Sequence, residues 1–345
     1  MSRKRFPPPN RAALLALAAG ALLPGLSGCH VIAGLEDDHT LRLSRWPDST
    51  TTFCATDMGP APCPAAGQGF YGQDGSYSLN VPEYREEGGI VHESVTGLDW
   101  RMHPAPALTW QEAIEGCAGF GDGYRLPTRL ELVSLVDYGR AEAKGPAAFG
   151  DLAQDYHWTS SIDADPTSSA WAVHFGCGPY PCDMPETSSP VDAGTTRRKY
   201  TMDPHAALCV RGEPLFGNPP ERETAPAESA YTDARTGLVW SQSIGTGTWE
   251  EALFDCQTLV EGGAEDWRLP NIKEIQTLII EMAPTPAEFL PFGNEELTLW
   301  SSTPYVGAAG WAYALYSNGG TAYAQKMDTN YYEFLCVRGP YPPPE

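Results

Sequence analysis

Positively charged residues are scarce in this sequence of 345 residues. It contains 22 Lys and Arg against 44 Asp and Glu, which gives a formal net charge of −22. Such a surplus of negative charge opposes binding to nucleic acid and to anionic lipid headgroups, because both carry the same sign of charge. It also weighs against sulfated polysaccharides unless basic residues are concentrated locally, and the densest basic run is Arg197-Arg198-Lys199. We therefore expect an acidic, soluble surface.

A long uninterrupted hydrophobic run is also missing. The most apolar stretch, Ala12–Leu26, follows a basic start and is interrupted by glycine and proline. It is too short to span a bilayer comfortably, so it predicts a signal peptide over residues 1–28 rather than a transmembrane anchor. The segment ends in Leu26-Ser27-Gly28-Cys29, which resembles a bacterial lipobox.

This resemblance implies cleavage before Cys29 and attachment of lipid to its thiol. The alternative is an ordinary secretory signal in which Cys29 is incidental. His30 stands where an Asp would resemble an inner-membrane retention signal, so we expect the outer membrane. Removal of residues 1–28 takes away four basic residues and no acidic residue, which changes the net charge from −22 to −26.

Recognisable catalytic motifs are absent. The sequence contains no HExxH, GxSxG, P-loop or dinucleotide fingerprint, and its seven histidines have no metal-ligand spacing. Cys177 near His174 is the one candidate for a reactive thiol, but Cys182 follows five residues later and favours a disulfide. We therefore expect a protein that is not an enzyme.

Cysteine, in contrast, is well represented. Nine cysteines are present, and reserving Cys29 for lipid leaves eight. An even number in an exported protein predicts four disulfides, for which sequence alone permits about 105 pairings.

The chain also repeats itself with an offset of about 140 residues. Seven matches occur in the same order in both halves, which indicates a tandem duplication of a whole domain. The matched pairs are Thr96–Trp100 with Thr236–Trp240, Thr109–Ala113 with Thr248–Ala252, Cys117 with Cys256, Arg125–Pro127 with Arg268–Pro270, Trp158–Ser161 with Trp300–Thr303, Ala170–Ala172 with Gly310–Ala312, and Cys209–Gly212 with Cys336–Gly339.

Local signals predict the elements of each copy. Two capping boxes per copy mark the starts of helices after Thr109, Thr128, Thr248 and Asn271. The rest of each copy, rich in Trp, Tyr, Ser and Gly, predicts strands and hairpins. The expected layout has five parts: a signal peptide (1–28), an irregular lead-in with one disulfide (29–76), a first domain (77–212), a Pro-rich linker (213–230) and a second domain (231–340).

The ordered motifs TGLxW, TWxEA, RLPxxxE, WSS and CVRG resemble the DUF1566 family, the C-terminal domain of the Legionella collagen-like adhesin (Lcl_C), in two copies. The resemblance covers about two-thirds of the chain after residue 28. It implies an α+β, C-type-lectin-like fold with two helices, a mixed and mostly antiparallel sheet and long loops. It also implies the disulfides Cys117–Cys209 and Cys256–Cys336. Cys177 and Cys182 lie in a segment without a counterpart in the second copy and are expected to pair with each other, and Cys54–Cys63 is the fourth expected bridge.

The function implied by the resemblance is adhesion, with an extracellular glycan or an envelope protein as partner. The alternatives are a structural envelope protein and, less favoured, a relative of formylglycine-generating enzymes. The candidate ligand-binding residues are Arg268, Asn271, Tyr305, Tyr316, Asn318 and Tyr323. Each has a structural alternative, because tyrosines also fill cores and an Arg before Leu-Pro also binds a carboxylate.

No cofactor is expected. The Glu-Pro-Asn, Gln-Pro-Asp and Trp-Asn-Asp motifs of calcium-dependent lectins are missing, so calcium stays an option only through scattered acidic residues. Those residues are Asp163, Asp165, Glu265 and Asp266.

Overall fold

The computed structural model describes residues 45–78, 80–105, 107–141, 145–150, 152, 155–162, 168–176, 194–216, 230–233, 235–242, 244–279, 281, 297–316, 320–327 and 332–339. The predicted signal peptide, Cys29, the expected Cys177–Cys182 pair and Asn318 lie outside these residues. Within them, no helix is long and apolar enough to cross a membrane.

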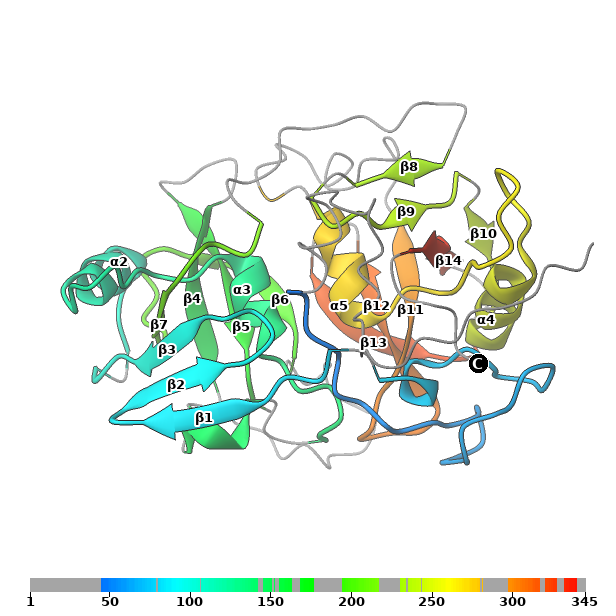
Figure 1. Cartoon of the computed structure of the whole chain (residues 1–345), viewed down its shortest axis with the longest axis horizontal. Coiled ribbons are helices and arrows are strands. Elements are labelled where there is room, and N and C mark those ends of the chain that lie inside the picture. The colour runs from blue at the N-terminus through cyan, green and yellow to red at the C-terminus, as the bar shows by residue number, and fades with distance from the viewer. Residues whose placement is uncertain are drawn as a thin grey trace, which may run out of the picture. The chain divides into compact units, whose positions relative to one another are not determined.

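The described part of the first copy contains two antiparallel sheets and two α-helices. One sheet has the strand order β1-β2-β3-β7 and the other β4-β5-β6 (Figure 1). The strands are β1 (Tyr84–Glu87), β2 (Ile90–Glu93), β3 (Asp99–Met102), β4 (Tyr156–Ile162), β5 (Ser169–His174), β6 (Thr196–Tyr200) and β7 (Leu208–Arg211). The helices are α2 (Trp110–Ala118), α3 (Arg129–Ser134) and the 3-10 turn η2 (Ala147–Phe149).

The second copy repeats this arrangement with shorter outer strands. Its sheets have the orders β15-β9-β8 and β10-β14-β11-β12-β13, and β11 with β14 is a parallel pair. The strands are β8 (Tyr231–Thr232), β9 (Val239–Trp240), β10 (Gly245–Thr246), β11 (Thr298–Pro304), β12 (Trp311–Tyr316), β13 (Thr321–Gln325), β14 (Glu333–Phe334) and β15 (Val337–Arg338). The helices are α4 (Trp249–Thr258), α5 (Ile272–Ile275) and the 3-10 turn η3 (Gln276–Leu278).

All four predicted capping boxes are formed, with the side-chain and backbone bonds both present. They satisfy amides of the first helical turn that have no partner inside the helix. The prolines before α3 and α5 have a second role, because their carbonyls accept hydrogen bonds from β4 and β11. Ser160 donates to Pro127, and Ser302 donates to Pro270, each at 2.7 Å. The Arg-Leu-Pro motif therefore ties the helix start to the sheet in both copies.

The strand register corrects one of the predicted matches between copies. Trp158 pairs with Ala172 across β4 and β5, and Trp300 pairs with Ala314 across β11 and β12. Because Trp158 and Trp300 correspond, the counterpart of Trp171 is Tyr313, and the match of Trp171 with Trp311 is wrong by two residues. A slip of two keeps the same face of a strand, so alternation in sequence does not reveal it.

The two copies share one apolar core. Trp171 and Leu132 of the first copy, Tyr313 and Ile275 of the second, and Trp46 of the preceding segment belong to a single cluster of buried side chains. The opposite face of each hairpin forms a separate outer core against α2 or α4. Small alanines alternate with large aromatic residues along β5 and β12, which gives the strands one face for each core.

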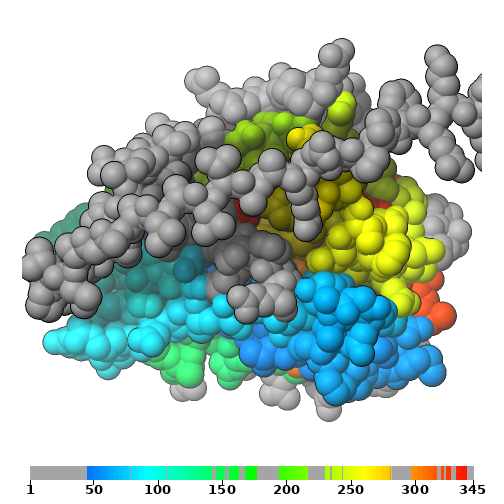
Figure 2. All heavy atoms as spheres, turned by 45° about the vertical axis from the view of Figure 1, so that its right-hand side comes forward, coloured from blue at the N-terminus to red at the C-terminus, as the bar shows by residue number. Residues whose placement is uncertain are grey.

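The described part of the lead-in, residues 45–76, contacts both copies. Arg45 donates to the Thr96 carbonyl of the first copy, at 2.6 Å from Nη2, whereas the Phe70 ring lies 6.1 Å from Trp249 of the second. Figure 2 shows the blue lead-in beside yellow residues of the second copy. The lead-in is irregular, as expected, apart from the 3-10 turn η1 (Asp74–Ser76).

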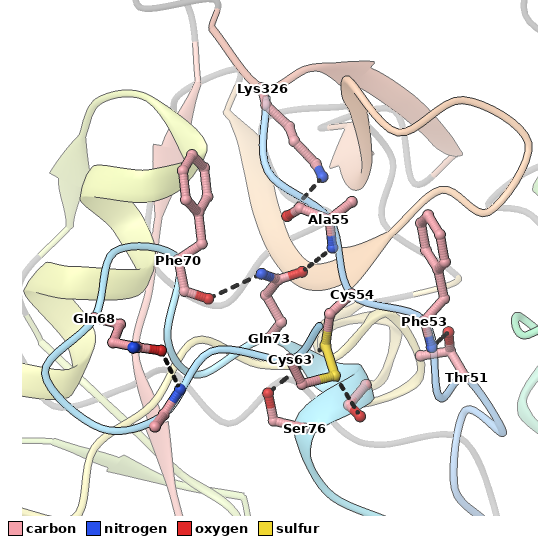
Figure 3. Close-up of a disulfide and its surroundings, with 12 residues drawn as sticks. Thr51, Phe53, Cys54, Ala55, Cys63, Gln68, Phe70, Gln73, Ser76 and Lys326 are labelled. Atoms are coloured by element: carbon pink, nitrogen blue, oxygen red, sulfur yellow. Dashed lines mark hydrogen bonds between the residues drawn. A yellow bond between two sulfur atoms is a disulfide. The ribbon is translucent and has the colours of Figure 1, made fainter. Parts of the chain in front are cut away.

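Three of the expected disulfides are present: Cys54–Cys63, Cys117–Cys209 and Cys256–Cys336. The latter two join residues 92 and 80 positions apart. Loops of this length correspond to about 4–5 kcal/mol each in the chain-entropy treatment. Figure 3 shows the short Cys54–Cys63 loop, beside which Gln73 accepts from the Ala55 amide at 2.9 Å and donates to the Phe70 carbonyl at 2.9 Å.

Candidate functional site

Arg268 and Asn271 are engaged inside the fold. The Arg268 guanidinium makes two hydrogen bonds to Glu274, at 2.6 and 2.5 Å, and Asn271 caps α5 by accepting from the Glu274 amide at 2.8 Å. Their exposed fractions are 5% and 9%. Arg125 binds Glu131 in the same bidentate manner in the first copy. This geometry supports the structural alternative for both candidates, since neither side chain is accessible to an extracellular ligand.

Tyr305 also lies inside the molecule. It is 4% exposed, and its ring meets Tyr313 edge to face with centroids 5.7 Å apart. Tyr313 in turn lies 4.9 Å from Tyr138 of the first copy. Tyr305 therefore belongs to the shared core. Tyr323 lies opposite Tyr313 on β13, but its side chain, like Asn318, is outside the described part.

Tyr316 is the candidate that reaches the outer side of the second copy. It ends β12 opposite Thr298, packs partly buried against the outer core, and lies on the same strand face as Ala314, the partner of Trp300. Tyr332 is also partly buried there, with its ring 4.8 Å from that of Trp300. We call Thr298, Tyr316, Tyr332 and Glu333 the Tyr316 face.

The Tyr316 face combines aromatic rings with a carboxylate. Glu333 accepts a hydrogen bond from the Thr298 amide at 3.0 Å, which fixes its position at the edge of β11. The Trp300 ring packs against Tyr332 of this face, and its indole N–H donates to the Gly247 carbonyl at 3.0 Å. Partly exposed rings present an apolar surface to the C–H groups of a ligand, and a carboxylate accepts hydrogen bonds from hydroxyl groups. The arrangement is suited to binding.

The corresponding end of the first copy carries different residues. Register and hydrogen bonds place Tyr156, His174 and His205 where the second copy has Thr298, Tyr316 and Tyr332. His205 lies 4.9 Å from Trp158, much as Tyr332 lies 4.8 Å from Trp300. The two copies therefore carry different chemistry at the same position, which the two-residue slip in the predicted match concealed.

A buried lysine lies where the copies and the lead-in meet. Lys273 of α5 has no exposed surface, and its Nζ donates to the carbonyls of Asp48 at 2.6 Å and Ser134 at 2.8 Å. Burial lowers its pKa to about 8, against the opposing effect of nearby carboxylates. Leu130 occupies the corresponding position in the first copy. Lys273 lies outside the apolar stripe formed by Ile272, Ile275 and Ile279, so the local sequence pattern does not indicate its burial.

Asp74 of the lead-in lies close to this junction. It has no exposed surface and accepts from the Thr303 hydroxyl at 2.6 Å. Burial and the negative charge of Asp48 raise its pKa to about 7. The sequence predicts an irregular segment with one disulfide here, and no local pattern indicates that Asp74 is buried.

Arg129 of the first copy binds residues of the second copy that follow α5. Its Nε donates to the Glu281 carboxylate at 2.8 Å and its Nη2 donates to the Gln276 carbonyl at 2.9 Å. The guanidinium also lies 5.6 Å from the Trp171 ring. Arg129 is fully buried, so these contacts hold the interface rather than a ligand.

Acidic residues do not gather into a metal site in the part of the chain described. No group of three or more His, Cys, Asp or Glu side chains there has suitable geometry. Asp266 pairs with Arg338 at 2.7 Å. Asp163 and Asp165 lie outside the described residues.

These features define a class of protein: a tandem pair of mixed α/β domains with mostly antiparallel sheets, each joined by a disulfide between its first helix and its C-terminal end. The sequence profile of the Lcl C-terminal domain matches residues 89–193 and 229–338, more than half of the chain. The chain therefore belongs to the Lcl C-terminal domain family and carries two tandem copies of the domain. Membership suggests an adhesin-like surface protein. No curated protein matches the chain.

Proposed function

We propose that the chain is an exported, lipid-anchored protein of the outer membrane that binds an extracellular glycan and catalyses no reaction. Family membership is the observation that carries this proposal. The lipobox ending at Cys29 supports the anchor, and the Tyr316 face supports binding. Each copy is proposed to be C-type-lectin-like, with the second copy as the ligand-binding one.

A second function is favoured by the charge of the chain. A net charge of −26 after removal of residues 1–28 disfavours sulfated glycans, because sulfate is repelled. The same charge is compatible with contact to a basic protein of the cell envelope. The alternative is therefore a structural envelope protein that uses the two domains for protein–protein contacts.

A glycan-array screen of residues 30–345, oxidised and at physiological salt, tests the first proposal. We expect selective signal for one glycan class and an approximately tenfold weaker signal for Tyr316→Ala, because partly exposed tyrosines contribute strongly at binding surfaces. Tyr200→Ala is the matched control, since Tyr200 is 71% exposed on the other copy. A blank array with intact disulfides would favour protein–protein contact, and equal loss in both variants would remove the Tyr316 face from the site.

A further inference from the structure

Two of the seven histidines of the chain, His174 and His205, contact the outer core of the first copy, and a third, His157, lies at the same end of β4 but faces the shared core. His174 lies 4.5 Å from the Tyr156 ring, and His205 lies 5.5 Å from Tyr156 and 4.9 Å from Trp158, all between ring centroids. His157 stands between these two aromatic residues on β4, so its side chain points to the opposite face of the strand, where its ring lies 5.1 Å from Phe175 of the shared core. We call His157, His174 and His205 the histidine cluster.

Each ring of the histidine cluster is held in an environment that suits its neutral form. The Gly176 amide donates to Nδ1 of His174 at 3.1 Å, so this nitrogen acts as an acceptor and carries no proton. His157 is 1% exposed, and its Nδ1 lies 3.1 Å from the Asp155 carbonyl, so the other ring nitrogen carries no proton in the neutral ring. Both ring nitrogens of His205 are buried without a hydrogen-bond partner among the described residues. Burial lowers the pKa of His157 to about 4 and also lowers that of His205.

The charged groups facing the cluster come from three neighbouring segments. Lys199 of β6 lies 3.6 Å above the Tyr156 ring and disfavours a further positive charge on His205. Asp155, which precedes β4, lies 3.9 Å from His205, and Asp203 follows β6; both carboxylates favour the charge. The histidines also repel one another once protonated. Burial outweighs the two carboxylates, as the net direction of the His205 pKa shows.

The second copy provides an internal comparison. Its residues at the three positions are Leu299, Tyr316 and Tyr332, as the strand registers and the matching backbone bonds to Leu108 and Gly247 indicate. Leucine does not titrate and tyrosine titrates near pH 10, so none of the three gains a proton in mild acid. At these three positions, the first copy carries side chains that can gain a proton in mild acid and the second copy does not.

We propose that the histidine cluster makes the first copy acid-responsive: protonation of His157, His174 and His205 opens the outer end of β4 and β5, while the matching end of the second copy stays closed. Protonation of His174 at Nδ1 removes the acceptor for the Gly176 amide. Protonation of His157 places a charge beside the Phe175 ring, 5.1 Å away, where no water solvates it.

The sign and size of the response follow from His157. Its pKa is lower in the folded state, so its stabilising contribution is present above pH 6.5 and is lost as the pH falls toward 4. Between pH 7.5 and 5 this residue alone raises the ratio of open to closed protein by about 30-fold. The partly exposed His205 changes in the same direction.

Hydrogen exchange of the full chain, followed by mass spectrometry at pH 7.5 and 5.0, tests the proposal. Rates are converted to protection factors, because the intrinsic exchange rate itself depends on pH. We expect protection in residues 156–174 to fall by at least tenfold on acidification, while protection in residues 298–316 changes less than threefold. Equal losses in both segments, or none in the first, would overturn the proposal.

Variants that carry the residues of the second copy make the test specific. His157→Leu alone, and together with His174→Tyr and His205→Tyr, should abolish most of the acid-induced loss in residues 156–174. His103→Gln, which changes a histidine outside the cluster, should keep it. The single variant keeps the test decisive if the triple variant does not fold. An unchanged acid response in His157→Leu would contradict the assignment.

Discussion

Single ionisable residues hold the junction between the lead-in and the two copies. The buried Lys273 ammonium donates hydrogen bonds to carbonyls from two other parts of the chain, and the buried Asp74 carboxyl accepts one from the Thr303 hydroxyl. Removing a buried hydrogen-bond partner leaves the other group unsatisfied, which costs more than the net contribution of the bond itself. These residues therefore make the lead-in an integral part of the folded unit rather than a spacer.

The pH dependence of Asp74 gives a prediction at this scale. Its pKa is raised to about 7, so its stabilising contribution is fully present below pH 3.8 and is lost as the pH rises through 7. Between pH 5.5 and 7.5 this loss amounts to about 2 kcal/mol. Asp74→Asn cannot ionise, so we expect the variant to lack this fall in the free energy of unfolding. Urea unfolding at both pH values measures it.

The exposed Asp122→Asn is the control for this measurement, since Asp122 lies in a surface turn with a φ of 50° that asparagine also tolerates. Its difference between the two pH values should match that of the unmodified protein. If Asp74→Asn retained the full fall in stability, the burial of an ionisable Asp74 at the junction would not be the cause.

At the scale of elements, the duplication allows one capping motif to be compared in two settings. The capping box of α4, Thr248 with Glu251, is exposed, whereas that of α5, Asn271 with Glu274, is buried. Asn271→Ala leaves a buried amide without a partner, so we expect a loss of about 2 kcal/mol. Thr248→Ala should cost about 1 kcal/mol or less, because water replaces the lost bond. Thermal unfolding of both variants checks the order, and equal losses would argue against a buried role for α5.

Local features of the elements were predictable from sequence, and non-local ones were not. Capping boxes and the Arg-Leu-Pro turn depend on residues a few positions apart, and the repeat follows from comparing two stretches of sequence, so these features were predicted correctly. The counterpart of Trp171 depends on strand register, which sequence alternation leaves open by two residues. Lys273 is buried by a contact with the other copy, and Tyr305 packs on Tyr313, which contacts that copy. No local pattern contains this information.

For the whole molecule, the shared core determines how the two copies act together. Trp171, Leu132, Tyr313 and Ile275 are buried in one cluster, so the copies are not independent domains on a flexible tether. A flexible tether adapts to many ligand spacings, whereas a shared core fixes one. Avidity then requires a target whose binding groups match that spacing.

The shared core also predicts how the chain responds to division. Residues 77–212 alone would expose the inner face of β5 and lose the contacts of Arg129 with Glu281 and Gln276. We expect this fragment to bind a hydrophobic dye and to lack a cooperative unfolding transition. Residues 30–216 and 230–345, refolded together as separate chains, keep both sides of the core and should associate into a complex that unfolds in a single transition. A cooperative fragment 77–212, with the unfolding midpoint of the full chain, would show that the shared core is dispensable.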